Sequence, residues 1–262
     1  MRIVVKVGTS TLAHTGGRLN IRRVELLCKV LSDMMNAGCQ IVLVSSGAIG
    51  MGVGKLALSG RPEDMPGKQA AAAVGQCELM YTYDKLFCEY NHTVAQILLT
   101  ADDVQDKRRS SHVRDTLERL LQWGVMPIIN ENDAVAIDEI GIHTTIGEND
   151  TLSAIVAKLV DADTLVLLSD INGLYTGDPR KDPEAKLIPL VEEITPEILS
   201  LAGGTGTSLG SGGMATKLKA AQLSTAAGID MVIANGEDPE QLYALLEGKH
   251  IGTKFSGRKV TV

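Results

Sequence analysis

The segment GSGGMATK, residues 210–217, places three glycines shortly before a lysine and is the first candidate for chemistry. Its spacing differs from that of the P-loop, which has Gly, four residues, Gly-Lys and then Ser or Thr. A helix beginning near Gly213 would put Lys217 about one turn in, at a glycine-lined end whose free N–H groups can bind an anion. A lysine there opposes the helix dipole unless an anion neutralises both. The segment therefore favours a phosphate site, and a flexible turn is the alternative.

A second lysine, Lys6, interrupts the apolar run RIVVKV of residues 2–7. A charge inside a buried strand is costly without a partner. This position predicts a paired or functional lysine, and a lysine on an edge strand is the alternative.

Small and polar residues follow several other apparent strands. They are Gly8 and Thr9, then Ser46 and Gly47, then Asp133, and then Ser169 and Asp170. In open parallel sheets the ligand site lies beyond the carboxyl ends of the strands, so these residues are expected to converge. Several also have a structural interpretation, because Ser46-Gly47 or Asp170 could cap a helix and Asp133 could be a turn residue.

Three polar residues, Glu148, Asn149 and Asp150, open the segment GENDTLSA, for which a helix over 150–160 is predicted. Acidic residues at a helix start suit the helix dipole without any functional role. The alternative is that Asp150 pairs with lysines and Asn149 contacts a substrate.

Two other common nucleotide-binding glycine patterns do not fit this sequence. GMGVGKL, residues 50–56, fails the P-loop pattern because Ile49 and Leu56 stand where Gly and Ser or Thr are required. No G-x-G-x-x-G lies at a strand-to-helix turn either, which weakens a dinucleotide-dependent oxidoreductase.

Apolar strands alternate with amphipathic helices along the whole chain. Strands are predicted at 2–7, 40–45, 93–100, 125–129, 164–169, 230–235 and 251–255, and helices at 21–37, 67–89, 111–123, 150–160, from about 213, and after an Asp238 cap. This alternation predicts an α/β fold in three layers, αβα, with a central, mainly parallel sheet. No linker separates two domains, so one domain over residues 1–262 is expected.

Composition excludes several classes of function. The net charge of −7 and an aromatic content of 3% argue against a nucleic-acid partner. No apolar run reaches the length of a membrane span, and the four cysteines show no metal-ligand spacing, so we expect a cytoplasmic protein and assign no residue as a metal ligand.

Two lysines, glycine-lined helix starts, carboxylates and no histidine are typical of phosphoryl transfer, where positioning and charge stabilisation do most of the work. An acceptor carboxylate is already ionised at neutral pH and needs no general base. The residues alone therefore predict a kinase whose acceptor can be a carboxylate.

The chain resembles the amino acid kinase family, on motifs that run from residue 3 to about 255. These motifs are VVKVGTS, LVSSGAIGMG, GKQAAAAVGQ, INENDAV, GENDTLSA, LLSDINGLYTGDPR and SGGMATKLKAA. The resemblance is strongest to members that phosphorylate the side-chain carboxylate of L-glutamate with ATP and Mg²⁺, giving γ-glutamyl phosphate for proline biosynthesis. It implies the amino acid kinase fold, with an acceptor lobe over about 1–160 and a nucleotide lobe over about 161–262.

The resemblance also implies residue roles. Lys6, Lys217 and Asp150 match catalytic positions; Ser46, Gly47, Asp133 and Asn149 match glutamate-binding positions; and Lys6, Gly8, Thr9, Ser169, Asp170, Ser211, Gly212, Gly213, Met214, Ala215, Thr216 and Lys217 match the ATP site. Glu148 receives no definite contact, because relatives often have Asp there.

Further expectations come from the same resemblance. They are a homo-oligomer, dimer or tetramer, proline as a feedback inhibitor, and no carboxyl-terminal PUA domain of the kind that many members carry. Two other functions stay open: a kinase of the same fold acting on another acceptor, and a non-catalytic nucleotide or amino-acid sensor.

Overall fold

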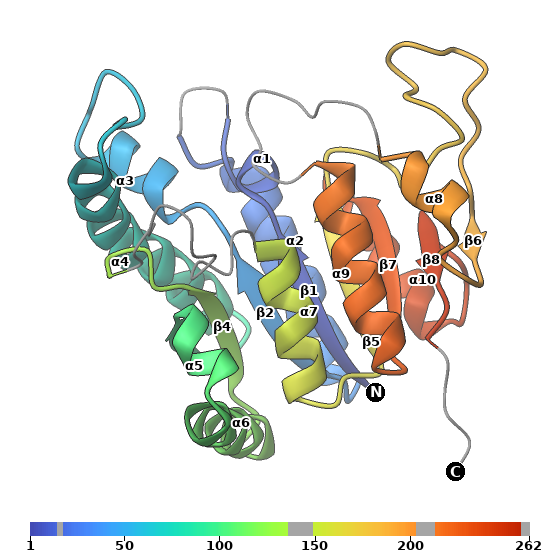
Figure 1. Ribbon diagram of the computed structural model, residues 1–262. Helices are drawn as coiled ribbons and strands as arrows, with labels where there is room; N and C mark the ends of the chain where they lie inside the picture. Colours follow the sequence, from blue (N-terminus) through green and yellow to red (C-terminus); the bar gives the residue numbers. More distant parts are fainter. Residues whose placement is uncertain (15–17, 136–148, 203–212, 258–262) are drawn as a thin grey trace.

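The computed structural model describes residues 1–14, 18–135, 149–202 and 213–257, and an eight-stranded sheet forms its centre (Figure 1). Its strands are β1 (Arg2–Val7), β2 (Gln40–Ser45), β3 (Val94–Leu99), β4 (Met126–Glu131), β5 (Thr164–Ser169), β6 (Leu190–Val191), β7 (Asp230–Asn235) and β8 (Thr253–Phe255). The strand order is β3-β4-β2-β1-β5-β7-β8-β6, and every neighbouring pair is parallel except β7 with β8. The predicted α/β class with a mainly parallel sheet is confirmed.

Helices connect the strands. They are α1 (Thr9–Leu12), α2 (Ile21–Asn36), α3 (Ala48–Lys55), α4 (Met65–Cys88), α5 (Ala101–Gln105), α6 (Lys107–Gln122), α7 (Asn149–Leu159), α8 (Pro196–Ser200), α9 (Met214–Ala226) and α10 (Leu242–Leu246), with a 3₁₀ turn at Pro239–Gln241. Among the described residues, no helix is both long enough and apolar enough to cross a membrane.

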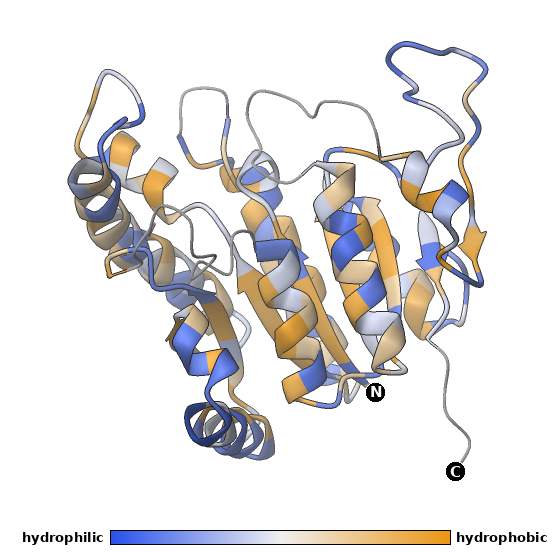
Figure 2. Ribbon diagram, viewed as in Figure 1, coloured by the Kyte–Doolittle hydropathy of each residue, from blue (hydrophilic) through white to orange (hydrophobic). Residues whose placement is uncertain are grey.

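Two hydrophobic clusters cover opposite faces of the sheet. One packs β-strand residues against α6, α7 and α9, as shown by Leu117, Leu152 and Leu218. The other packs them against α2, α4 and α10, as shown by Leu27 and Leu242. Figure 2 shows apolar residues along the central strands and polar residues on the outer side of α6. The three predicted layers follow from this burial of both faces of the sheet.

Strand β1 lies in the middle of the sheet, between β2 and β5. Its side chains alternate between the two faces, as strand geometry requires. Ile3, Val5 and Val7 belong to the cluster beneath α2, whereas Val4 belongs to the cluster beneath α7 and α9. Lys6 is two residues beyond Val4, so its side chain extends toward the layer that contains α7 and α9.

Local signals explain where several helices begin and end. The Asn20 side chain accepts a hydrogen bond from the Arg23 backbone N–H and caps α2, as predicted. The Asp106 side chain caps α6, which therefore begins four residues before the predicted start at 111. Asp238 caps a short 3₁₀ turn that continues into α10, so the predicted cap is confirmed and the helix type there is mixed.

The glycines of GMGVGKL belong to helix α3 and serve its packing on α4. A Cβ atom on Gly52 would lie 1.8 Å from the Ala71 carbonyl oxygen of α4, and one on Gly75 of α4 would lie 1.8 Å from the Ala48 carbonyl oxygen. The absence of side chains at these two positions lets the backbones of α3 and α4 approach each other closely. The helical structure of this segment is consistent with the prediction that it is not a phosphate loop.

Candidate active site

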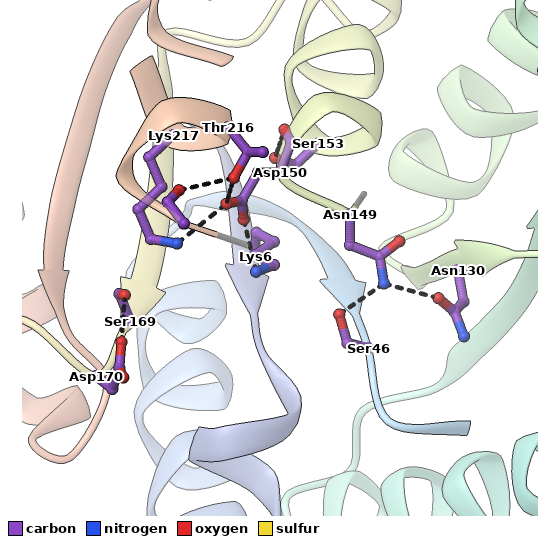
Figure 3. Close-up of polar contacts among 11 residues, drawn as sticks. Lys6, Ser46, Asn130, Asn149, Asp150, Ser153, Ser169, Asp170, Thr216 and Lys217 are labelled. Carbon is purple, nitrogen blue, oxygen red and sulfur yellow. Dashed lines mark hydrogen bonds and ion pairs between the residues drawn. The ribbon is translucent and has the colours of Figure 1, made fainter. Parts of the chain in front are cut away.

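Two buried lysines contact one buried aspartate at the carboxyl end of β1 (Figure 3). The Lys6 Nζ atom lies 2.6 Å from Asp150 Oδ1, and the Lys217 Nζ atom lies 3.1 Å from Asp150 Oδ2. Lys6 is 8% exposed, Lys217 is 5% exposed and Asp150 is 1% exposed. The paired interpretation of Lys6 is confirmed, and the edge-strand alternative is wrong because β1 is a central strand.

The charge of Asp150 is set by two opposing effects. Burial raises the pKa of this carboxyl group, but the positive charges and hydrogen bonds of Lys6 and Lys217 outweigh burial and hold the pKa below its ordinary value. Asp150 is therefore an anion at neutral pH. The helix-dipole interpretation of Asp150 is insufficient, because the residue lies in the first turn of α7 and also joins two lysines from β1 and α9.

The first turn of α9 contributes more than Lys217 to this cluster. Gly213 is the N-cap, and its carbonyl oxygen accepts a hydrogen bond from Thr216 Oγ1 at 2.8 Å. The same Thr216 hydroxyl lies 3.3 Å from Asp150 Oδ2. A helix start after Gly213 is thus confirmed, with Met214 and Ala215 in its first turn. Ser211 and Gly212 lie outside the described residues, as does Glu148.

A second polar group lies beside this cluster, at the ends of β2 and β4 (Figure 3). The Asn149 amide nitrogen donates to Ser46 Oγ at 2.6 Å and to Asn130 Oδ1 at 3.0 Å. The N-cap of α3 is Gly47, in the left-handed region at φ 111°, and not Ser46. The helix-cap interpretation of Ser46-Gly47 is therefore confirmed at Gly47, whereas the Ser46 side chain contacts Asn149, the first residue of α7.

Asp133 lies in the turn that follows β4 and is partly buried. Burial raises the pKa of this carboxyl group, and the positive charge of Arg61 opposes that rise in part. Within the described part of the chain no hydrogen bond joins Asp133 to Ser46 or Asn149. Its position is consistent with the turn interpretation and with a place near the second polar group.

The opposite side of the lysine cluster carries Ser169 and Asp170, at the end of β5. Ser169 Oγ donates to Asp170 Oδ1 at 3.2 Å, and Asp170 Oδ2 lies 3.5 Å from Arg180 Nη2. Bends rather than a helix follow Asp170, so the N-cap alternative is wrong. Gly8 and Thr9, which form the N-cap and first residue of α1, begin at the end of neighbouring β1.

The sheet order explains why these groups meet. Strands β4, β2, β1 and β5 are consecutive neighbours, and all four are parallel, so their carboxyl ends lie along one edge. Along this edge the Asn149 group comes first, the lysine cluster second, and the Ser169–Asp170 pair third. Sequence reasoning assigned no role to Asn130, Gln76 or Arg180, although they lie in the motifs INENDAV, GKQAAAAVGQ and LLSDINGLYTGDPR, because no residue pattern within a motif shows which side chains meet in the fold. Among the described residues, no group of three or more His, Cys, Asp or Glu side chains is placed to hold a metal ion.

Comparisons with known proteins show the family of this chain. The model of the amino acid kinase family matches residues 1–235. A protein of Clostridium perfringens (strain 13 / Type A) named glutamate 5-kinase is 55% identical over 98% of this chain and 96% of its own length. A glutamate 5-kinase of Clostridium tetani (strain Massachusetts / E88) is 56% identical, over 98% of this chain and 95% of its own length.

Solved structures confirm the fold. The product complex of isopentenyl phosphate kinase from T. acidophilum superposes with a TM-score of 0.68 at 17% identity, covering 97% of this chain and 100% of that one. At that identity the likeness concerns the fold alone, whereas the two clostridial relatives match in sequence along nearly their whole length. This chain therefore belongs to the amino acid kinase family and, within it, to the glutamate 5-kinases.

Proposed function

We propose that this protein transfers the γ-phosphoryl group of ATP to the side-chain carboxylate of L-glutamate, giving γ-glutamyl phosphate and ADP, the first step of proline biosynthesis. One observation carries the proposal: Asp150 holds two buried lysines together, directly beside an amide and hydroxyl group suited to a polar acceptor. The relationship to the glutamate 5-kinases supports the choice of acceptor.

The proposed chemistry relies on placed charge. Lys6 and Lys217 would neutralise the equatorial oxygens of the phosphoryl group in transit, and Asp150 would fix the separation of the two ammonium groups. A side-chain carboxylate is an ionised nucleophile at neutral pH, so the reaction requires no general base. This agrees with a candidate site built from lysine, aspartate, amide and hydroxyl groups.

The order of groups along the sheet edge suggests how the substrates lie. Glutamate would occupy the side near Ser46, Gly47, Asp133 and Asn149, while ATP would occupy the side near Gly8, Thr9, Ser169, Asp170 and the segment 211–217. The transferring phosphoryl group would then lie over Lys6 and Lys217, between the two. This corresponds to an acceptor lobe over about residues 1–160 and a nucleotide lobe over about 161–262.

Mg²⁺ would enter with ATP, because this ion keeps several waters and commonly binds through substrate phosphates. It would offset charge on the phosphate oxygens. Both carboxylate oxygens of Asp150 are already engaged by lysines. We therefore assign Asp150 to the lysines and not to the metal.

Three further expectations belong to this proposal. Proline, a five-carbon amino acid like glutamate, would compete near the Asn149 group and inhibit the enzyme. The protein would act in the cytoplasm and assemble as a homo-oligomer, dimer or tetramer. Inhibition curves with proline and light scattering of the purified protein measure the first and last of these.

The test is hydroxamate formation with ATP, Mg²⁺ and hydroxylamine, which traps an acyl phosphate before water destroys it. L-glutamate, L-aspartate and N-acetyl-L-glutamate are offered in parallel to the wild type, Lys217→Ala and Lys219→Ala. Lys219 is the matched control, because it is exposed on the same helix two residues further on. We expect product with L-glutamate, lost in Lys217→Ala and retained in Lys219→Ala.

Other outcomes would contradict the proposal in distinct ways. Product with a different acceptor would keep the kinase chemistry and overturn the substrate. ATP binding without any product would favour a non-catalytic sensor on the same fold.

A further inference from the structure

A chain of three side-chain amides, Gln76, Asn130 and Asn149, leads from helix α4 to the Ser46 hydroxyl. Asn130 Nδ2 donates to Gln76 Oε1 at 3.0 Å, and Asn149 Nδ2 donates to Asn130 Oδ1 at 3.0 Å. The same Asn149 nitrogen donates to Ser46 Oγ at 2.6 Å. Gln76 is 9% exposed and Asn130 is 3% exposed, so this amide chain runs through the interior and joins α4, β4, α7 and the end of β2.

The amide chain has a direction. Each amide has an oxygen that only accepts and a nitrogen that only donates. Because Gln76 presents its oxygen to Asn130, Asn130 turns its own oxygen toward Asn149, and Asn149 turns its nitrogen toward Ser46. If one amide were reversed, two oxygen atoms or two nitrogen atoms would face each other at its contacts with the neighbouring amides, and neither pair can form a hydrogen bond.

The direction of Asn149 is imposed by these neighbours. Its other end, Oδ1, is buried and has no hydrogen-bond partner in the described part of the molecule. An unpaired buried acceptor is unfavourable, so the orientation must be held by the two hydrogen bonds at Nδ2.

The direction decides what Ser46 can offer. An amide nitrogen cannot accept a hydrogen bond, so the Ser46 hydroxyl accepts from Asn149 and its own hydrogen stays available for another group. A hydroxyl donor suits a carboxylate. If the amide chain were reversed, the Asn149 oxygen would face Ser46 and would take that hydrogen.

We propose that Gln76 is a positioning residue for the phosphorylation reaction: its carbonyl oxygen sets the direction of the amide chain, so that Ser46 donates its hydroxyl hydrogen to a carboxylate of the amino-acid substrate. This inference rests on the proposed function. Asn149 is followed directly by Asp150, so the start of α7 links this donor to the lysine cluster in one backbone segment.

The test is a double-mutant cycle on Gln76→Met and Ser46→Ala, with the hydroxamate assay giving KM for L-glutamate, KM for ATP and kcat. Methionine has nearly the length of glutamine but lacks the acceptor oxygen. We expect Gln76→Met to raise KM for L-glutamate about tenfold, as for the loss of one hydrogen bond to a charged group, with KM for ATP and kcat changed by less than about threefold. In the Ser46→Ala background the same substitution should raise KM for L-glutamate by less than about twofold, because the donor it orients is gone.

The controls separate positioning from packing. Gln122→Met alters an exposed glutamine at the end of α6 and should leave all three constants unchanged. Gln76→Ala also lacks the acceptor oxygen and goes through the same cycle, so the test does not depend on one variant folding.

Two outcomes would overturn the inference. One is an unchanged KM for L-glutamate in Gln76→Met and Gln76→Ala. The other is an equal rise with and without the Ser46 hydroxyl, which would mean that Gln76 acts through packing alone. The wild-type arm tests the function itself, since failure to phosphorylate L-glutamate there would refute the proposed reaction whatever the variants do.

Discussion

Replacing Asp150 with asparagine removes the negative charge between Lys6 and Lys217 while keeping the size of the side chain. The two ammonium groups are 2.6 Å and 3.1 Å from the carboxylate oxygens, and all three residues are at least nine-tenths buried. Removing one partner of a buried ion pair leaves an uncompensated charge and costs about 3–5 kcal/mol. We therefore expect Asp150→Asn to lower the free energy of unfolding by about that amount.

The loss of unfolding free energy in Asp150→Asn also predicts a shift in the thermal midpoint. For a domain of this size each kcal/mol corresponds to roughly 2–4 °C, so Tm should fall by roughly 6–20 °C. Turnover should fall by more than about a hundredfold, because the spacing of the two lysines is no longer fixed. Urea unfolding at neutral pH and the hydroxamate assay measure the two effects.

The pH dependence has a definite sign. The ion pairs hold the pKa of Asp150 below its unfolded value, so they stabilise the fold above the unfolded pKa and the stabilisation is lost as pH falls through the lower, folded pKa. The difference between the wild type and Asp150→Asn should therefore be fully present at neutral pH and shrink only in acid, below about pH 4.

A matched control and a rescue experiment test the role of the negative charge of Asp150. Asp115→Asn, at an exposed position on α6, should change the free energy of unfolding by less than about 0.5 kcal/mol. Inorganic phosphate should stabilise Asp150→Asn more than the wild type, because an anion can take the place of the lost carboxylate. If Asp150→Asn unfolds like the wild type and retains turnover, the two lysines do not depend on this carboxylate and the account of the cluster is wrong.

Three further predictions concern the chemistry, the packing and the pH response. Lys6→Met should lower kcat by more than about a hundredfold and change KM for L-glutamate by less than about threefold. If KM for L-glutamate rose by the same factor as kcat fell, the role of Lys6 would not be confined to the phosphoryl group. Gly75→Ala should lower the free energy of unfolding by roughly 2 kcal/mol or more, since the new Cβ atom would overlap the Ala48 carbonyl oxygen. Gly50→Ala in α3 is the control: the nearest atom to its Cβ would be 3.6 Å away, so urea unfolding should show a neutral or stabilising effect. Burial raises the pKa of Asp133, and the positive charge of Arg61 opposes this rise in part. KM for L-glutamate should therefore rise as pH falls through the raised pKa. If the plot of KM against pH keeps this transition in Asp133→Asn, another group titrates.

Much of the fold could be predicted because its signals are local. The strands 2–7, 40–45, 164–169 and 230–235 are mainly apolar runs, and all four lie at the predicted positions. Their apolar character follows from burial on both faces of a parallel sheet. The cap at Asn20 and the helix start after Gly213 were predicted in the same way, from residues whose effect is confined to a few neighbours.

Other elements depend on contacts that no local pattern contains. Strand β8 is antiparallel to β7, although the alternation of strands and helices favours parallel neighbours. Helix α3 follows β2 through a left-handed Gly47, and its glycine at position 52 reflects the closeness of α4, whose contact residues Ala71 and Gly75 come 19 positions after Gly52 and 27 positions after Ala48. A glycine pattern in sequence does not distinguish a phosphate loop from a close helix contact.

The sequence by itself determined the class of fold, the family and the residue types needed for phosphoryl transfer, because apolar periodicity, caps and motifs are written in neighbouring positions. Only the tertiary structure decided which groups meet. Lys6, Asp150 and Lys217 come from three elements separated by more than sixty positions at each step, and their ion pairs exist because β1 is central and α7 and α9 cover the same face. The amide chain from Gln76 to Ser46 likewise requires α4 and α7, which cover opposite faces of the sheet, to meet at the end of β4, since hydrogen bonds depend on distance and direction in space and not on separation along the chain.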